Sequence, residues 1–409
     1  MNIKVAITHT DFRIYWPARL ESLTRYLKNQ NIDLHIIELA GQGSPYEFNT
    51  ENKINKKVNW QCLFPNIKIE NINSKIAAKN IFKKLDEINP DIVIAGAIAF
   101  TTGITAIYWS KINNKKVISF DDARIEDVPR SKIVNYIKRK VYSTVDAAIC
   151  PSEAHKESFI FWGVRPEKLF VGLNVIDNKW FKSKTDHYKT QKDDTAKELN
   201  INKKFILGVG RLVKKKNWAS LIKAYAQLSN SHKNLPNLVL IGEGPEKNEM
   251  LMLIEQYSME EQIEIINFVD QEKLCQYYSL AECLILPSTY GETWGLVINE
   301  AMASGLYILA SHQCGSTSAL IENNSNGFVF DGTNINTIKD AILKSTNLNP
   351  EQIKMMKSNS LKTIENWDLE RFNIACHEAI QYVNMNKSKK IGLIERFIFA
   401  NWKGRYRPT

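Results

Sequence analysis

Long apolar segments, paired cysteines and clustered histidines are all missing from this chain of 409 residues. Its six cysteines form no C-x-x-C pair and its seven histidines no H-x-x-x-H pattern, so we expect neither a disulfide framework nor a protein-built metal site. The first residues, MNIKVAITHT, lack the charged and apolar regions of an export signal. These absences favour a protein of the reducing cytoplasm.

Negative charge is also scarce relative to positive charge, and the formal net charge is +10 at pH 7. Such an excess suits nucleic acid, anionic lipid or a small molecule that carries phosphate. The cations gather at residues 130–140 (RSKIVNYIKRK), 214–216 (KKK) and 387–407. No zinc-finger, homeodomain or RNP signature accompanies them, so nucleic acid is not expected as a partner.

Strand-like apolar runs alternate with helical patterns along the whole chain, which indicates an α/β protein with parallel sheets. The runs are KVAIT, LHIIEL, DIVIAGA, KVISF and AAIC in the first half, and KFILGVG, LVLIG, IEIINFV, CLILPS, LYILAS and NGFVF in the second. Helices are expected over 218–228, 272–281 and 294–304. The length suits two domains with a cleft between them, and the more regular second series predicts a doubly wound, Rossmann-like domain.

We divide the chain at the polar interval that separates the two series. An N-terminal α/β domain is expected at 1–181, a linker region at 182–200, and a Rossmann-like domain at 201–365. Helices with a basic, aromatic tail are expected at 366–409.

The first candidate ligand-binding turn is 208–211 (GVGR), followed by the lysines at 214–216 and a helix. Glycines such as Gly210 let backbone approach a phosphate, Arg211 can bind a diphosphate through two N–H groups, and Lys216 adds a compact charge. The lysines could instead form a solvated face. A nicotinamide fingerprint is not met, because Val213 and Lys247 stand where its third glycine would be.

A second candidate is the segment 287–305 (PSTYGETWGLVINEAMASG), which places two carboxylates around one apolar helix. Carboxylates such as Glu292 and Glu300 accept hydrogen bonds from paired hydroxyls, which suits a sugar. Gly291 and Gly295 would expose backbone N–H groups beside Glu292. Alternatively, Glu292 is a favourable acid at a helix start, and Glu300 reaches solvent at a helix edge.

With these motifs, residues 205–330 resemble the C-terminal domain of glycosyltransferase family 4, and the first half resembles this family loosely. The resemblance implies the GT-B architecture, in which two Rossmann-like, doubly wound domains face a cleft: an N-terminal acceptor-binding domain and a C-terminal nucleotide-sugar-binding domain. The resemblance implies that Glu292 contacts the donor sugar and Glu300 the ribose hydroxyls. It also implies that Arg211 and Lys216 hold the donor diphosphate. The segment 174–177 (NVID), followed by Phe181, resembles the family's interdomain strand end.

The family resemblance extends the expected donor site to backbone positions. Gly242 and Gly244 resemble the family's second glycine turn. Phe268 and Val269 resemble the segment whose backbone contacts the nucleobase in that family. The expected donor-binding positions besides Arg211, Lys216 and Glu292 are Gly210, Gly242, Gly244, Phe268, Val269, Gly291, Thr293, Trp294, Gly295, Leu296 and Glu300.

The resemblance implies retaining, metal-independent transfer of a hexosyl-type sugar from a UDP- or GDP-linked donor, without a cofactor. The acceptor would be a glycan or lipid-linked molecule in cell-surface polysaccharide or lipopolysaccharide synthesis. Cleavage leaves negative charge on the diphosphate, which preorganised Arg211 and Lys216 can stabilise, and the departing phosphate is the expected base. Two other interpretations stay open: a nucleotide-sugar epimerase on the same scaffold, and a catalytically degenerate partner subunit.

The first half departs from the family pattern. Many members carry a histidine after a strand that resembles KVISF, where this chain has Asp121 and Asp122. Asp122, or Asp121, could act in its stead, or either could cap a turn. Trp16 and Arg19 could meet the acceptor, or Trp16 could pack at the start of the first helix.

Two basic segments, 130–142 and 387–408, also contain aromatic and branched apolar residues. Both could lie on anionic lipid, which would place a cytoplasmic protein at the inner membrane face. In the tail, Ile391, Ile394, Ile398 and Trp402 form a helical stripe that could instead dock onto the first domain.

Overall fold

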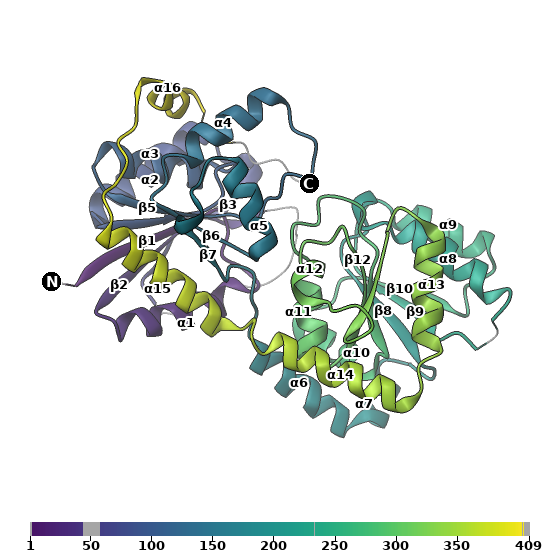
Figure 1. Ribbon diagram of the computed structural model, residues 1–409. Helices are drawn as coiled ribbons and strands as arrows, with labels where there is room; N and C mark the ends of the chain where they lie inside the picture. Colours follow the sequence, from purple (N-terminus) through teal and green to yellow (C-terminus); the bar gives the residue numbers. More distant parts are fainter. Residues whose placement is uncertain (1, 44–57, 233, 403, 405–409) are drawn as a thin grey trace. The chain divides into compact units, whose positions relative to one another are not determined.

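The computed structural model describes residues 2–43, 58–232, 234–402 and 404. The chain falls into two compact units, each with its own sheet (Figure 1). Unit 1 comprises residues 1–123, 130–175 and 369–409, and unit 2 comprises 124–129 and 176–368. No described helix is long and apolar enough to cross a bilayer.

Unit 1 is built on a seven-stranded parallel sheet in the order β3-β2-β1-β4-β5-β6-β7. Successive side chains of β1 alternate between two cores: Val5 and Ile7 lie in one, and Ala6 in the other. Both faces are therefore buried, as in doubly wound folds. The strands are β1 (Ile3–His9), β2 (Ile32–Gln42), β3 (Trp60–Lys68), β4 (Ile92–Ala95), β5 (Lys116–Phe120), β6 (Ala147–Cys150) and β7 (Leu169–Val171).

Helices cover both faces of this sheet. On one face lie α1 (Trp16–Lys28) and α15 (Leu369–Met385), and α15 enters the unit from the far end of the sequence. The other core receives side chains from α2 (Ser74–Ile88), α3 (Thr101–Ile112), α4 (Lys132–Tyr142) and α5 (Glu153–Phe161). The last helix, α16 (Leu393–Asn401), packs on α3 and α4.

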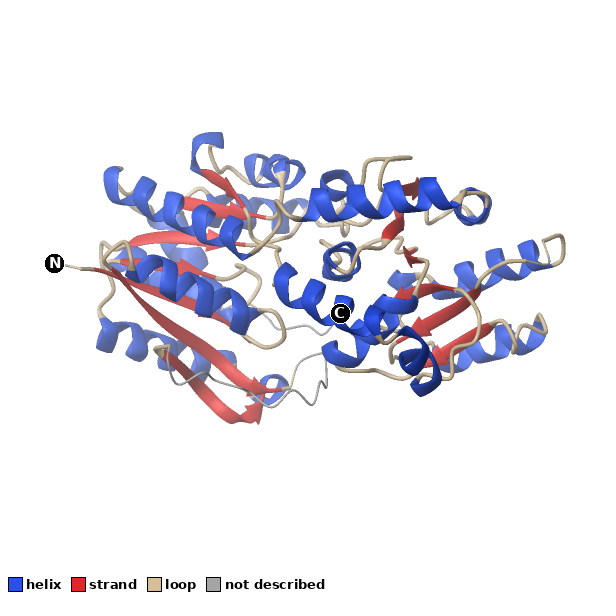
Figure 2. Ribbon diagram, turned by 90° about the horizontal axis from the view of Figure 1, so that it is seen from below, coloured by secondary structure: helices blue, strands red, loops and turns tan. Residues whose placement is uncertain are grey.

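Unit 2 has a six-stranded parallel sheet in the order β10-β9-β8-β11-β12-β13. Its helices and strands alternate along the chain (Figure 2). The strands are β8 (Phe205–Val209), β9 (Asn237–Ile241), β10 (Ile263–Ile266), β11 (Cys283–Leu286), β12 (Tyr307–Ser311) and β13 (Gly327–Phe330). The helices are α6 (Asn178–Thr190), α7 (Lys192–Glu198), α8 (Trp218–Ser229), α9 (Lys247–Gln256), α10 (Gln271–Leu280), α11 (Leu296–Ala303), α12 (Thr317–Leu320), α13 (Ile335–Thr346) and α14 (Pro350–Ile364).

The strand order reverses once in each sheet, between β1 and β4 in unit 1 and between β8 and β11 in unit 2. The loops that follow these strands diverge at the carboxyl edge, where open parallel sheets bind their ligands. The expectation of two doubly wound units is confirmed. The topology indicates these two edges as the places where a ligand would bind.

The structure corrects the expected linker at 182–200. This interval is helical, and α6 and α7 pack against α10 within unit 2. Asp177 caps α6 by accepting a hydrogen bond from the amide of Trp180 (3.0 Å), and Phe181 and Thr185, four residues apart, are buried. A narrow apolar stripe is easily overlooked in so polar a segment. The chain passes between the units at residues 175/176 and 368/369 instead.

Two edge strands, β3 and β7, were not among the expected runs. β3 contains Pro65 and leaves much of its length exposed, which is tolerated only at the edge of a sheet. β7 has three residues, too few for a periodic pattern.

A buried ion pair of Lys111 and Asp146 also contacts Ser388, and so links the C-terminal segment to the rest of unit 1. Asp146 accepts hydrogen bonds from the ammonium of Lys111 (2.9 Å), the hydroxyl of Ser388 (2.7 Å) and the amide of Val117 (2.8 Å). The side chains of Lys111 and Asp146 are 2% and 5% exposed. Burial lowers the pKa of Lys111, so this ammonium depends on its partner.

We expect Asp146→Ala to destabilise unit 1 by about 3–5 kcal/mol, because it leaves a buried charge without its partner. Urea-induced unfolding would measure the change. The matched control is Glu87→Ala, which removes a surface partner of Lys84 and should leave stability unchanged. Equal stability of both variants would contradict this account.

Candidate functional site

The centre of the candidate site in unit 2 is an ion pair at its topological switch point. Lys216 follows β8, and Glu292 follows β11, the neighbouring strand. The ammonium of Lys216 and a carboxylate oxygen of Glu292 lie 2.5 Å apart, with side chains 11% and 12% exposed. The hydroxyl of Ser288 donates to the same carboxylate at 3.1 Å. The structure therefore brings together two of the residues expected to act in catalysis.

The electrostatics keep this carboxylate ionised. Burial by itself raises the pKa of Glu292, but the charge and hydrogen bond of Lys216 outweigh it, and Lys215 and Ser288 act in the same direction. The pKa of Glu292 is therefore below its ordinary value. The site holds a negative charge and its positive partner ready before any ligand arrives.

Two glycine turns pack tightly beside the pair. A Cβ at position 242 would lie 1.9 Å from the carbonyl oxygen of Gly210, and one at position 244 would lie 2.3 Å from that of Leu212. The amide of Gly210 donates to Ile241 at 3.0 Å, and that of Leu212 to Glu243 at 2.8 Å. Only glycine permits this close approach of the two turns at Gly242 and Gly244. The expected contact of these glycines with a donor stays a prediction.

Arg211 lies in the first of these turns, and its carbonyl oxygen accepts hydrogen bonds from the indole of Trp218 (2.9 Å) and the amide of Val213 (3.0 Å). Its backbone is thus fixed between β8 and α8, with Lys216 buried at the end of the same short loop. The expected contact of Arg211 with a diphosphate stays a prediction.

Glu300 is buried within α11, at 2% exposure. It accepts a hydrogen bond from the hydroxyl of Tyr278 at 2.8 Å. The alternative that Glu300 reaches solvent at a helix edge is therefore wrong. Its role toward ribose hydroxyls stays a prediction.

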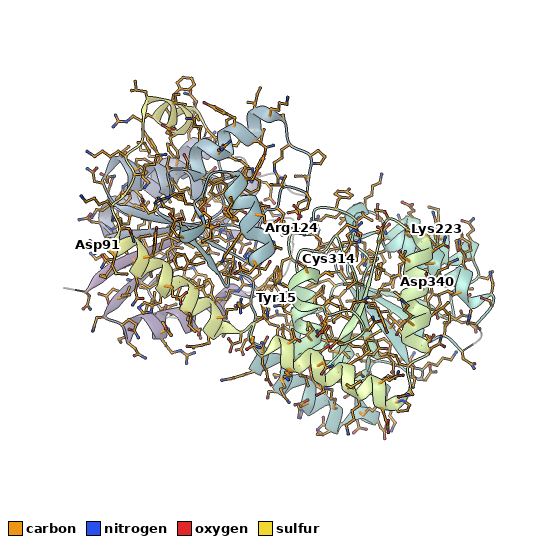
Figure 3. All side chains as sticks on the ribbon, viewed as in Figure 1. Tyr15, Asp91, Arg124, Lys223, Cys314 and Asp340 are labelled. Atoms are coloured by element: carbon orange, nitrogen blue, oxygen red, sulfur yellow. The ribbon has the colours of Figure 1, made fainter. Side chains whose placement is uncertain are left out.

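A segment from the first half of the sequence belongs to this site. Residues 124–129 group with unit 2, where the amide of Gly291 donates to the carbonyl of Asp127 at 3.0 Å. Arg124 donates to the side chain of Asp127 (2.9 Å) and to the carbonyl of Gln313 (2.8 Å), beside Cys314 (Figure 3). The expectation that Gly291 offers a free amide is therefore wrong, because Asp127 already occupies it.

The turn before α11 is held from a second side. The amide of Gly315 donates to the carbonyl of Glu292 (2.9 Å), and that of Ser316 to the carbonyl of Trp294 (3.0 Å). Trp294 is 1% exposed, and its indole donates to Asn299 at 2.9 Å. Its side chain is therefore part of the core, and only its backbone is available for the predicted role.

The remaining predicted donor positions lie at the same edge of the sheet. Gly295 adopts a left-handed conformation (φ 91°) before α11 begins at Leu296, so the first amides of that helix follow Thr293 and Glu292 directly. Phe268 and Val269 come just after β10, and Phe268 is 41% exposed. Their contacts with a donor stay predictions.

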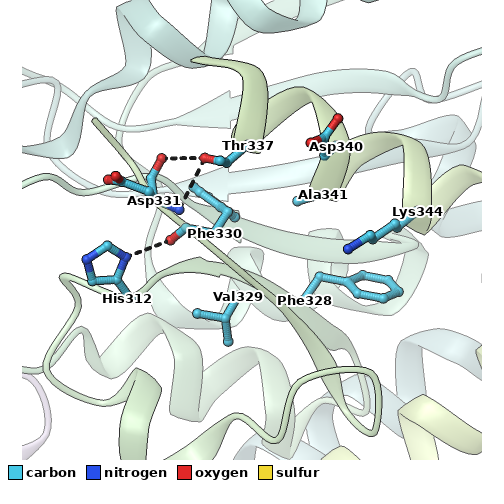
Figure 4. Close-up of a pocket in the computed structure, with 9 residues that line it drawn as sticks. All are labelled: His312, Phe328, Val329, Phe330, Asp331, Thr337, Asp340, Ala341 and Lys344. Carbon is cyan, nitrogen blue, oxygen red and sulfur yellow. Dashed lines mark hydrogen bonds between the residues drawn. The ribbon is translucent and has the colours of Figure 1, made fainter. Parts of the chain in front are cut away.

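A shallow pocket lies along β13 and α13, at the edge of the same sheet (Figure 4). His312 Nδ1 lies 3.2 Å from the carbonyl oxygen of Phe330, and the hydroxyl of Thr337 donates to the carbonyl of Asp331 at 2.7 Å. These two contacts join β13 to the segment after β12 and to α13. We assign the ligand site to the switch point rather than to this pocket.

The corresponding edge of unit 1 contains the two aspartates that follow β5. Asp121 is buried, accepts from the amide of Ala123 at 3.0 Å, and is hydrogen-bonded to the hydroxyl of Tyr142. It therefore stabilises the turn. Asp122 is half-buried and accepts from the side chain of Asn174 at 3.3 Å. Of the two, Asp122 remains the candidate catalytic residue.

The structure corrects the role expected of Arg19. This side chain is 2% exposed, and its guanidinium donates twice to the carbonyl of Val175, at 2.8 and 2.6 Å. Arg19 therefore fastens the end of unit 1 instead of presenting its charge to an acceptor. Trp16 begins α1 and packs against Phe12 and Phe372, as the alternative for this residue proposed.

Sequence reasoning missed His9, the last residue of β1 at the switch point of unit 1. Its ring lies among aromatic rings, 5.4 Å from Trp16 and 5.2 Å from Phe120. Burial lowers the pKa of His9 to about 4, so the ring is neutral. Its Nδ1 is buried without a hydrogen-bond partner in the described part of the chain. The sequence did contain a signal for this residue, because His9 is a polar residue at the carboxyl end of the first strand, where ligands of such sheets bind.

Comparison with known proteins agrees with this fold. The family description "Glycosyl transferases group 1" matches residues 189–363, and "Glycosyltransferase Family 4" matches residues 18–180. A relative, alpha-monoglucosyldiacylglycerol synthase of Streptococcus pneumoniae, is 23% identical over 356 residues, which cover 83% of this chain and 79% of that protein.

Another relative is the Campylobacter jejuni N-acetylgalactosamine-N,N'-diacetylbacillosaminyl-diphospho-undecaprenol 4-alpha-N-acetylgalactosaminyltransferase. It is 25% identical, and the match covers 57% of this chain and 59% of that enzyme. Among solved structures, a glycosyltransferase from Rickettsia africae superposes with a TM-score of 0.73 at 17% identity, over 94% of this chain and 99% of the other. An Anabaena protein in complex with UDP and glucose superposes with a TM-score of 0.70 at 16% identity, over 93% and 100% of the two chains.

The two Rossmann-like units have the GT-B fold, and the matched family models identify the chain as a glycosyltransferase. The chain belongs to glycosyltransferase family 4, the group 1 glycosyl transferases. The resemblance seen in residues 205–330 is thereby confirmed, and it extends through the first half.

We expect Gly242→Ala to destabilise unit 2 by about 1–3 kcal/mol or more, because its Cβ would overlap the carbonyl of Gly210 and force the two turns apart. Gly392→Ala is the matched control, since a Cβ there meets only the flexible end of Glu395. Thermal unfolding of both variants would measure the difference. If the two behave alike, the packing of the glycine turns is not the constraint described here.

Proposed function

We propose that this glycosyltransferase is retaining and metal-independent and transfers a hexosyl-type sugar from a UDP- or GDP-linked donor. The observation that carries the proposal is the Lys216–Glu292 pair at the β8/β11 switch point, flanked by two glycine turns and Arg211. One Anabaena protein of the same fold has been solved in complex with UDP and with UDP-glucose, which makes UDP the first nucleotide to test.

The chemistry follows from where charge develops. As the bond between the anomeric carbon and phosphate breaks, the electron pair stays with the diphosphate, and positive charge grows on the sugar. In the proposal Arg211 and Lys216 stabilise the diphosphate, and the ionised Glu292 lies beside the sugar. These groups are preorganised, so little reorganisation is required when the bond breaks.

Retention is proposed with the departing phosphate as the base that accepts the proton of the acceptor hydroxyl. The new bond then forms on the face that the phosphate leaves. No dedicated protein base is required, although Asp122 is held in unit 1 as a candidate to contact the reacting sugar. The two lysines next to Glu292, Lys215 and Lys216, support leaving-group stabilisation without a metal ion.

The proposed acceptor is a glycan or a lipid-linked molecule, for a role in cell-surface polysaccharide, lipopolysaccharide or glycolipid synthesis. The names of two relatives specify a diacylglycerol lipid and a diphospho-undecaprenol acceptor, respectively. A cytoplasmic protein that associates with the inner membrane face would reach such acceptors. The acceptor side of the site is proposed for the aromatic edge of unit 1 around Trp16 and His9.

The donor proposal is tested by nucleotide binding. At a concentration near 100 times Kd, the matching nucleoside diphosphate should raise the midpoint of thermal unfolding by roughly 5–10 °C, with or without chelator. Arg211→Ala should abolish the shift, whereas Lys214→Ala, which removes an exposed lysine from the same loop, should preserve it. A shift that needs metal would overturn the metal-independent proposal, and no shift with any nucleotide would favour the degenerate-subunit alternative.

The role of Glu292 is tested by Glu292→Gln, which keeps its shape and removes its charge. Sugar transfer from the identified donor should fall about 10²–10³-fold in kcat while nucleotide binding persists, because the loss concerns the developing charge. The matched control is Glu243→Gln at an exposed position of the neighbouring glycine turn. Undiminished turnover by Glu292→Gln would refute the assignment, and conversion of the donor without any acceptor would favour an epimerase.

A further inference from the structure

The last helix, α16, has two apolar faces, and only one of them is covered. On the inner face Phe399 is 1% exposed and stacks on Tyr108 of α3, with ring centroids 5.4 Å apart. Ile391, Ile398 and Trp402 pack against the same core of unit 1. The docking predicted for the tail is therefore confirmed for these three members of the stripe.

The outer face of α16 remains in solvent. Leu393 is 86% exposed, Phe397 70% and Ile394 52%. Leu393 and Phe397 are one helical turn apart, and Ile394 lies beside them. The alternatives of docking and lipid contact thus apply to opposite faces of one helix.

A second apolar stripe lies on α4, which α16 contacts (Figure 1). Ile133 is 71% exposed and Tyr136 51%, and both share a helix face with Lys140. The ammonium of Lys140 lies 5.7 Å from the centre of the Tyr136 ring and 3.4 Å from the carboxylate of Glu395, at the start of α16. This chain of contacts joins the two stripes into one surface.

The charge around these stripes has one sign. Residues 130–142 contain five cations and no acid, and residues 387–402 contain four cations and a single acid, Glu395. That carboxylate is already engaged by Lys140 and by the amide of Gly392 at 3.0 Å. Lys132 and Arg139 on α4 are exposed, as are Lys389, Lys390 and Arg396 near α16. An excess of cations around exposed apolar side chains is the pattern of a helix that lies in a membrane interface.

We propose that α4 and the outer face of α16 form a docking surface for an anionic lipid bilayer, here called the α4–α16 surface. Its apolar members are Ile133, Tyr136, Leu393, Ile394 and Phe397, and its cations are Lys132, Arg139, Lys389, Lys390 and Arg396. The apolar side chains enter the boundary between head groups and acyl chains, and the cations bind the anionic head groups. A second copy of the chain is disfavoured as the occupant, because two such surfaces would place like charges together.

The inference does not depend on the proposed reaction, because every residue that carries it lies in unit 1 and outside the donor site. Binding to vesicles and the nucleotide-induced thermal shift are separate measurements. Loss of one with retention of the other distinguishes a failure of this inference from a failure of the donor proposal.

The test is co-sedimentation of the full chain with vesicles of phosphatidylcholine, with and without phosphatidylglycerol. We expect strong binding only when the anionic lipid is present, and weaker binding at high salt. Leu393→Ser combined with Phe397→Ser should weaken it roughly tenfold or more, and so should Lys132→Gln combined with Arg139→Gln.

The matched control is Leu251→Ser combined with Met252→Ser on α9 in unit 2, where the two side chains are 46% and 62% exposed. This double variant should bind vesicles like the parent, and all variants should keep the parent's thermal transition. Equal binding to neutral and anionic vesicles, or unchanged binding by both surface variants, would overturn the proposal. So would concentration-dependent self-association in sedimentation velocity that the surface variants abolish, since the surface would then join two copies.

Discussion

The buried pair of Lys216 and Glu292 is the interaction around which the second unit's loops are organised. Two charges removed from water are tolerated only when they lie within contact distance and their remaining hydrogen-bonding capacity is used. The loops after β8 and β11 must therefore close on each other. Three contacts hold the loops in this closed arrangement. They are the close approach of Gly242 to Gly210, the hydrogen bond from the amide of Gly291 to the carbonyl of Asp127, and the hydrogen bond from the amide of Gly315 to the carbonyl of Glu292. Any looser arrangement of these loops would leave two buried charges apart, at a cost in free energy.

The two switch points differ in chemistry although their topology is alike. In unit 2 the edge is ionic, with a carboxylate held charged by its lysine neighbours. In unit 1 the edge around His9 is aromatic, and burial lowers the pKa of His9 so that its ring is neutral, although Asp121 and Asp122 lie at the same edge. An ionic edge suits a diphosphate, and an aromatic edge suits the apolar faces of a sugar ring. A single fold, used twice, thus provides two different environments through the residues that end its strands.

The sequence allowed both sheets to be anticipated, because buried parallel strands are continuous apolar runs: KVISF and AAIC coincide with β5 and β6. It failed where apolar content is sparse, at the edge strands and at α6, whose buried side is limited to Phe181 and Thr185. Within the site, the motifs singled out Lys216 and Glu292 separately, but they did not predict the ion pair that joins them. The contacts of Arg124 and Arg19 were not predicted either, since each is made with a carbonyl oxygen more than 150 positions away, and backbone carbonyls leave no trace in a sequence.

The route of the chain between the units has a further consequence. Unit 1 is completed by α15, whose Phe372, Cys376 and Ile380 fill the same core as α1, and unit 2 includes residues 124–129. Neither unit is therefore a contiguous stretch of sequence, and an amino-terminal fragment that ends at residue 175 would lack the contribution of α15 to its core. To exchange unit 2 between relatives, in evolution or in the laboratory, residues 176–368 must be replaced as an internal segment with a junction at each end. A single joint between two halves would not suffice. The segment 124–129 would then meet a foreign glycine turn, and its fit there would decide which exchanges succeed.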